Sequence, residues 1–202
     1  MMDYVLKLNG GQATIVDVVP GVIMFFCAPF LGRASKRDGL KKAGMYSSVP
    51  LALAFFSLFF VNNMWQAMAA YTAMIVFSAV GSIIHVPMLA AVVDEDEQRT
   101  GLRKPGLFTG LNALLTIPVG GMHTVIFTSI LGAFTFVSGS DVQRYQALLG
   151  VRIGASLVPF VSVLLGIIPM ALSPITLKKE KELSDFSEQQ HRANSDVSAD
   201  PV

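Results

Sequence analysis

Five apolar segments, each long enough to cross a membrane, dominate the sequence. They lie near residues 12–31, 45–61, 66–93, 106–137 and 147–173. About 20 helical residues span the roughly 30 Å of bilayer hydrocarbon, and every backbone polar group inside the bilayer needs a partner within the protein. The segments lack the alternating pattern of barrel strands. The sequence therefore predicts an all-α integral membrane domain over residues 12–173, built from five transmembrane helices.

The composition argues against most soluble functions. Hydrophobic residues make up 52% of the 202 residues and charged residues 14%, against roughly 25% charged in an ordinary soluble domain. The net charge of +1 gives no field that would attract nucleic acid. A single cysteine, Cys27, leaves neither a disulfide framework nor a cysteine-based metal cluster. The four carboxylates at 94–97 lack the glycine and the spaced ligands of a calcium loop. We therefore expect no enzyme activity, no catalytic or metal-binding residues, no bound cofactor and no nucleic-acid partner.

The distribution of Lys and Arg sets the expected orientation. Twelve of the fifteen basic residues fall on one side of the predicted spans, whereas the other side has only Lys7 and Arg144, and Arg152 lies within a span. Because basic loops favour the cytoplasm, we expect a multi-pass protein of the cell or cytoplasmic membrane, with residues 1–11 and the N-terminus outside and the C-terminus cytoplasmic. The twelve are Arg33, Lys36, Arg37, Lys41, Lys42, Arg99, Arg103, Lys104, Lys178, Lys179, Lys181 and Arg192.

The tail of the chain changes composition abruptly near Thr176. Residues 178–182 are all Lys or Glu, and the remainder is rich in Ser, Gln, Asp and Asn. Such a segment buries too little apolar surface to offset the entropy lost on ordering. We expect residues 174–202 to form a cytoplasmic tail that begins as a polar helix and is otherwise largely disordered.

The loop between the first two predicted spans is basic and rich in turn residues. Its residues Gly32, Arg33, Arg37, Gly39 and Lys41 are spaced so that the loop resembles the cytoplasmic signature of the major facilitator superfamily, although Lys36 stands where that signature has an acidic residue. In the superfamily this signature acts as a latch between transport conformations, because its arginines meet helix ends and carboxylates. The alternative is that the charge only sets topology and contacts lipid headgroups.

A second charged segment, residues 94–112, resembles a more specific family. The acidic run 94–97, followed by Arg99-Thr100-Gly101, Arg103, Gly106-Leu107-Phe108 and Asn112, is similar to the glycoside-pentoside-hexuronide:cation symporters, the group that includes melibiose permease. The similarity is to the junction of their tenth and eleventh helices. Residues 146–152, with Pro159, resemble the start of the twelfth helix. The resemblance implies that the five spans correspond to helices 8–12 of a twelve-helix major facilitator fold, an incomplete carboxy-terminal half.

This resemblance implies a role in secondary active transport. Members of the superfamily move a solute by alternating access between two six-helix halves, and in this family a sugar or related small solute moves with a cation. We expect the main site for that cation, Na⁺ or H⁺, on the amino-terminal half. The expected partners are the lipid bilayer, a small-molecule solute and that other half, in the same polypeptide or as a split partner, without which the chain would not transport. The alternative is a non-transporting fragment or regulatory protein that reuses the half-fold.

Polar residues inside the spans are the candidates for the solute pathway, because each is unfavourable in lipid and normally faces the bundle interior. Asn112 and Thr116 lie one turn apart and share a face; they line the cavity in the resembling family, and interhelical hydrogen bonding is the alternative. His123 lies near the middle of the same span, with packing as its alternative role. Ile117 stands where many relatives carry a lysine, which places the cation coupling and sugar specificity of this chain in question.

Asp17 and Arg152 are further pathway candidates, each a turn or two from the outer end of its span. Two interpretations stay open. The two side chains form a mutual ion pair, or Arg152 extends outward to the interface while Asp17 faces interfacial water.

The two charged segments are also expected to meet at the cytoplasmic mouth. The segment 33–42 is basic and the run 94–97 is acidic, so we predict that they pair in one conformational state. Asp94, Glu97 and Arg103 complete the predicted latch, and charge reversal of Arg37 together with Glu97 is expected to restore the transport lost in either single reversal.

Two pairs of glycines predict close helix packing. Gly106 and Gly110, and likewise Gly150 and Gly154, are four residues apart, and such small residues let transmembrane helices approach closely.

Overall fold

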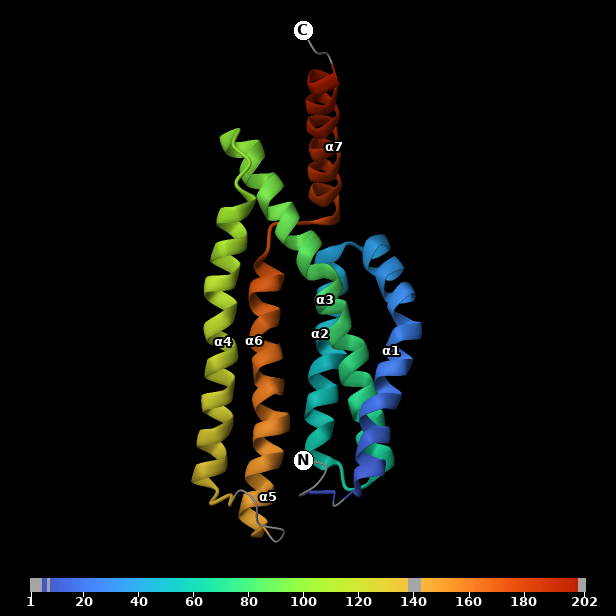
Figure 1. Cartoon of the computed structure of the whole chain (residues 1–202), viewed down its shortest axis with the longest axis vertical. Helices are drawn as coiled ribbons and strands as arrows, with labels where there is room; N and C mark the ends of the chain where they lie inside the picture. The colour runs from blue at the N-terminus through green and yellow to red at the C-terminus, as the bar shows by residue number, and fades with distance from the viewer. Residues whose placement is uncertain (1–4, 7, 138–142, 200–202) are drawn as a thin grey trace.

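The computed structural model describes residues 5–6, 8–137 and 143–199 of the chain, residues 190–199 by their backbone alone. All regular elements in this part are helical, and the long helices stand side by side (Figure 1). In chain order they are α1 (Gly10–Asp38), α2 (Leu40–Ser57), the 3-10 turn η1 (Leu58–Phe60), α3 (Met64–Thr100), α4 (Pro105–Ala133), α5 (Tyr145–Arg152), the π-helical turn η2 (Ile153–Leu157), α6 (Val158–Leu172) and α7 (Leu177–Ala199).

Five helical stretches are long and apolar enough to cross a membrane. They are Gly10–Asp38, Leu40–Phe60, Met64–Thr100, Pro105–Ala133 and Tyr145–Leu172. They confirm the predicted all-α membrane fold with five spans. Residues 1–4 and 7 of the predicted N-terminal segment, and residues 200–202 of the tail, lie outside the described residues.

Asparagine caps fix where α1 and α3 begin. The Asn9 side chain accepts a hydrogen bond from the backbone N–H of Gln12 at 2.9 Å, and the Gln12 side chain accepts one from the N–H of Asn9 at 3.2 Å. Asn63 likewise accepts from the N–H of Gln66 at 2.9 Å. Each cap satisfies backbone donors that a helix start leaves without partners.

Both charged segments are more helical than an aqueous loop would be. The basic segment belongs to α1 and α2 and breaks only at Gly39, whose φ of +86° suits glycine better than any residue with a Cβ. The acidic run 94–97 forms the last turns of α3, where Glu95 and Arg99 pair at 3.5 Å. That helix ends at Gly101 (φ +70°), whose N–H donates to the carbonyl of Glu97 at 2.8 Å.

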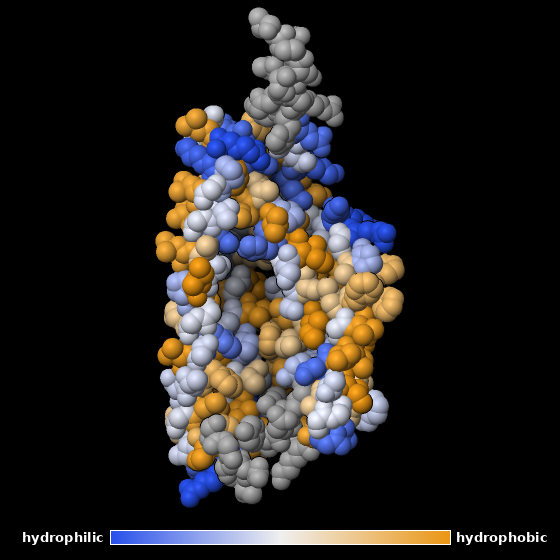
Figure 2. Space-filling view, viewed as in Figure 1, coloured by the Kyte–Doolittle hydropathy of each residue, from blue (hydrophilic) through white to orange (hydrophobic). Residues whose placement is uncertain are grey.

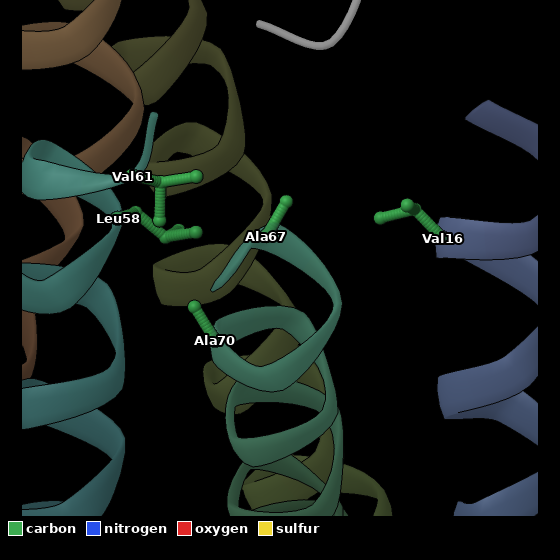
Figure 3. Close-up of a cluster of buried hydrophobic side chains, with 5 residues drawn as sticks. All are labelled: Val16, Leu58, Val61, Ala67 and Ala70. Carbon is green, nitrogen blue, oxygen red and sulfur yellow. The ribbon is translucent and has the colours of Figure 1, made fainter. Parts of the chain in front are cut away.

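The helix α3 is the centre of the packing. Both α1 and α2 pack along it, and α2 also packs along α6. In one buried cluster, Val16 of α1 points toward Ala67 of α3, whereas Ala70 of α3 lies on the side of Leu58 and Val61, which come from the connection between α2 and α3 (Figure 3). The small side chains on α3 allow this close approach, as expected for helix packing inside a bilayer.

The helix α4 stands at the edge of the bundle, beside α6 in Figure 1. None of its residues is buried. Its main contacts with the rest of the described chain are with α5 and η2 and with α3. A 29-residue helix is therefore held to the rest of the fold by a small part of its surface.

The tail differs from its prediction, because the structure continues it as the helix α7 to Ala199. In Figure 1 this helix extends beyond the ends of the transmembrane helices. Its first turns are held by burial, since Leu183 is only 1% exposed and packs with Ala91 of α3 and Ile175. Lys178 and Glu182, one turn apart, add a 4.0 Å pair on its exposed side. Long-range contacts thus hold the start of α7, which the sequence predicted as a polar helix, and the helix continues past them where the composition indicated disorder.

Candidate functional site

A polar stripe runs along α4. At about 100° of rotation per residue, Thr109, Asn112, Thr116 and His123 all fall within an arc of roughly 60° around the helix. Three of the four are exposed and Asn112 is half-buried. The structure thus places Asn112 and Thr116 on one face, as their spacing predicted, and His123 falls on the same face. It adds Thr109, which its spacing from Asn112 and Thr116 would have identified.

Only part of the stripe's hydrogen-bonding capacity is used. The Thr116 hydroxyl donates to the carbonyl of Asn112 at 2.8 Å, which satisfies its proton within the helix. The side-chain amide of Asn112 and the ring of His123 have no hydrogen-bond partner among the described residues. Ile117 lies about 100° around the helix from Thr116 and is 74% exposed, so it points away from the stripe.

Close contacts at two glycines show which side of α4 carries the polar stripe. A Cβ on Gly154 would lie 2.6 Å from the ring of Phe127, and one on Gly150 would lie 2.7 Å from Cβ of Phe134. Phe127 falls within the same arc as the stripe, so the stripe runs along the side of α4 that turns toward η2. The face of the molecule in Figure 2 is hollowed near mid-height, with apolar side chains on either side of the hollow.

The outcomes for the two predicted glycine pairs differ. Gly150 and Gly154 confirm close packing between α4 and the α5–η2 segment. For Gly106 and Gly110 the prediction is wrong for the described part of the chain, because a Cβ on either would meet none of its atoms within 4 Å. Gly106 and Gly110 therefore lie on an exposed part of α4 that no described residue covers.

Arg152 links α5 to the connection between α2 and α3. Its guanidinium donates to the carbonyl of Phe59 at 2.6 Å and to Oδ1 of Asn62 at 2.9 Å. These partners replace the ion pair with Asp17 that was one of two interpretations. Asp17 is instead exposed on α1 with no ion-pair partner among the described residues. The contact is charge-assisted and reaches the end of a helix, where carbonyls lack intrahelical partners.

The acidic run at the other end of the bundle forms ion pairs with Arg103 and Lys179 and not with the predicted basic segment 33–42. Nη1 of Arg103 lies 2.9 Å from Asp94 and 2.6 Å from Glu97, and Glu95 pairs with Lys179 of α7. The hydrogen bond from Arg103 to Glu97 raises the pKa of the guanidinium above its ordinary value, despite an opposing effect of burial, so Arg103 stays charged. Asp94, Glu97 and Arg103 therefore come together as one cluster.

The basic segment has separate contacts. Arg37 lies 4.0 Å from its neighbour Asp38, and Arg33 lies over the ring of Phe30 at 6.0 Å. In the part of the chain that the structure describes, no ion pair joins 33–42 to 94–97. The predicted pairing is thus not made in this conformation. Arg103, which is only a few residues from the acidic run along the chain, takes the carboxylates of Asp94 and Glu97 instead.

Gly39 and Lys41 belong to a second cluster, which ties α2 to α6 and α7. Nζ of Lys41 donates to the carbonyls of Ala171 and Ser173 at 2.8 and 2.6 Å, at the end of α6. The N–H of Leu40 donates to a carboxylate oxygen of Glu180 at 3.0 Å, which satisfies the first turn of α2. A Cβ on Gly39 would lie 3.1 Å from Leu177. Gly32, the remaining predicted latch residue, has nothing within 4 Å of a Cβ placed on it.

Sequence reasoning missed Glu95, Lys179 and Glu180. Each joins segments separated by more than 80 residues, and no local pattern specifies such partners. The alternation of Lys and Glu at the start of the tail indicated only a polar helix.

Comparison with known families assigns the chain. The family model described as MFS/sugar transport protein matches residues 1–177, a range that includes all five spans. No curated protein and no solved structure matches the chain. The family match points to a transporter rather than to an enzyme. The chain belongs to the MFS/sugar transport protein family, within the major facilitator superfamily.

Proposed function

We propose that the chain forms one wall of the solute pathway in a secondary active transporter, with the polar stripe of α4 facing that pathway. The observation that carries the proposal is the position of Thr109, Asn112, Thr116 and His123 on one arc of a helix that has no buried residue. Polar side chains in a transmembrane helix normally face a water-filled cavity or other helices rather than lipid. Family membership supports the same role.

The proposed solute is a sugar or a related small molecule, moved together with Na⁺ or H⁺ by alternating access. The support is the family match and the resemblance of residues 94–112 to the cation-coupled symporters. The stripe offers an amide, hydroxyls and an imidazole, which are groups that hydrogen-bond to sugar hydroxyls. The main cation site is proposed to lie on the other half of the transporter.

The proposed partner is an amino-terminal set of helices, in the same polypeptide or as a separate chain. Five helices supply only one side of a solute pathway that lies between two halves of a transporter. In addition, α4 leaves most of its surface without contacts to described residues. In the proposed orientation the end that carries α7 is cytoplasmic, because the basic residues gather there. The N-terminal end of α1 is then on the outside, in the cell or cytoplasmic membrane.

A second candidate function is a non-transporting membrane protein or regulatory partner. The feature that favours it is Ile117, an apolar residue where the resembling symporters carry a lysine. In this case the chain would bind other helices without supporting solute flux.

Reconstitution separates the two candidates. The chain is placed in proteoliposomes alone and together with an amino-terminal transporter half, and uptake of a panel of labelled sugars is measured with and without a Na⁺ or H⁺ gradient. We expect uptake only when both parts are present and a gradient is applied. Stable association of the two parts without uptake of any sugar, under either gradient, would favour the regulatory role.

A further inference from the structure

A cavity of about 350 Å³ lies where the bend between α1 and α2 meets the start of α7. Met45, Tyr46 and Leu177 give it a mostly apolar wall, and Lys42 and Thr176 add an ammonium and a hydroxyl. Among the described residues that line the cavity, only Lys42 offers a cation without a partner. An apolar wall with such a cation at its edge suits an amphiphile better than a small soluble ion.

The cavity spans the depth at which α2 enters the membrane. Lys42 lies in the first turn of α2, outside the apolar run that begins near residue 45, whereas Met45 and Tyr46 lie at the start of that run. Tyr46 is 69% exposed, and exposed tyrosines typically mark the boundary between headgroups and hydrocarbon. On the α2 side of the cavity, Lys42 thus lies nearer the predicted aqueous end and Met45 and Tyr46 nearer the predicted hydrocarbon, which is the order of headgroup and acyl chain in a phospholipid.

The charge around the cavity favours an anionic ligand. The segment 33–42 carries five basic residues and one acidic residue, Asp38. Asp38 is on the cavity wall but has Arg37 at 4.0 Å, which offsets its repulsion of an anion. Lys41 is occupied by the carbonyls at the end of α6. Lys42 is exposed, and within the described residues it has neither a hydrogen bond nor an ion pair, so its ammonium is available.

We propose that this cavity binds one anionic phospholipid of the leaflet at the basic end of the bundle. The phosphate contacts Lys42, and the glycerol and upper acyl chain lie along Met45 and Tyr46. Basic pockets between transmembrane helices are known to bind anionic headgroups. The lipid would sit beside the contact between Gly39 and Leu177, so it would stabilise the same junction of α2 with α7 that Glu180 holds.

The test uses the purified full chain in a neutral detergent, with phosphatidylglycerol and phosphatidylcholine as probes and native mass spectrometry as the measurement. We expect one phosphatidylglycerol retained per chain and no comparable retention of phosphatidylcholine. Lys42→Ala is expected to weaken phosphatidylglycerol binding about five-fold, the value for roughly 1 kcal/mol per basic contact with an anionic lipid. A micelle of neutral detergent has no continuous anionic surface, so basic residues far from the cavity add little to the binding of phosphatidylglycerol.

Lys36→Ala is the matched control, because Lys36 is exposed, lies in the same basic segment and does not line the cavity. It should bind phosphatidylglycerol like the wild type. Equal losses in Lys36→Ala and Lys42→Ala would overturn the proposal in favour of a general charge effect. Equal retention of both lipids would also overturn it, as would displacement of the lipid by inorganic phosphate, which would indicate a site for a free anion.

Discussion

Arg103→Ala is expected to lower the free energy of unfolding by about 2 kcal/mol. The arginine is the shared partner of Asp94 and Glu97 at 2.9 and 2.6 Å, and the two carboxylate side chains are only 11% and 14% exposed. Removing one partner of a buried ion pair leaves an uncompensated charge and costs roughly 3–5 kcal/mol. The effect is smaller here because the Arg103 side chain is 38% exposed and therefore partly screened by solvent.

Arg37→Ala is the control for this prediction. It removes the same side chain from the basic segment, where Arg37 is 89% exposed and lies 4.0 Å from Asp38, so the expected change is within roughly 0.5 kcal/mol. Thermal unfolding of both variants in detergent provides the measurement. A large loss in Arg37→Ala with none in Arg103→Ala would restore the predicted pairing of 33–42 with 94–97. Charge reversal of Arg103 together with Glu97 should recover part of the stability lost in either single reversal.

Gly150→Ala is expected to destabilise the protein by about 1–3 kcal/mol, the usual cost of overpacking. The new Cβ would lie 2.7 Å from Cβ of Phe134, an atom that cannot move without the backbone. At Gly154 the nearest atom belongs to the ring of Phe127, at 2.6 Å, and a ring can pivot. Gly154→Ala should therefore cost less than Gly150→Ala, and both should loosen α4 from the α5–η2 segment.

Gly166→Ala in α6 is the matched control, because nothing lies within 4 Å of a Cβ at that position. It should be neutral or slightly stabilising, since alanine favours helix more than glycine does. Unfolding temperatures of the three variants in the same detergent rank the effects. Equal values for Gly150→Ala and Gly166→Ala would mean that α4 does not pack closely on α5.

The sequence predicted those features that depend on local periodicity. The number of spans follows from the lengths of the apolar runs, and the shared face of Asn112 and Thr116 follows from their spacing. The close packing at Gly150 and Gly154 follows from the same kind of pattern. The pattern does not say which surface a glycine pair meets, and so it predicts close packing equally for Gly106 and Gly110, although no described neighbour lies within 4 Å of a Cβ placed on either.

Contacts between distant segments were beyond such patterns. Arg152 has both an acidic candidate, Asp17, and the helix end near Phe59 at the same end of the bundle. Only the packing of η2 against η1, which brings Arg152 to Phe59, decides between them. The tail is a similar case. Its alternation of Lys and Glu predicts a polar helix at its start, but not the burial of Leu183 or the bond from Leu40 to Glu180, because those contacts depend on groups that α2 and α3 present. The continuation of the helix to Ala199 also differs from the disorder that the composition predicts.

The central claim is that the stripe on α4 faces an aqueous pathway, and cysteine accessibility in native membranes tests it most directly. Cys27 is replaced by serine, and cysteine is then introduced at Asn112 or at Leu114, which lies on the opposite side of α4 and is 68% exposed. We expect a membrane-impermeant thiol reagent to label Asn112→Cys, with protection by the transported solute, and to leave Leu114→Cys in lipid unlabelled. Equal labelling of the two positions, or labelling of Leu114→Cys alone, would contradict the proposed pathway.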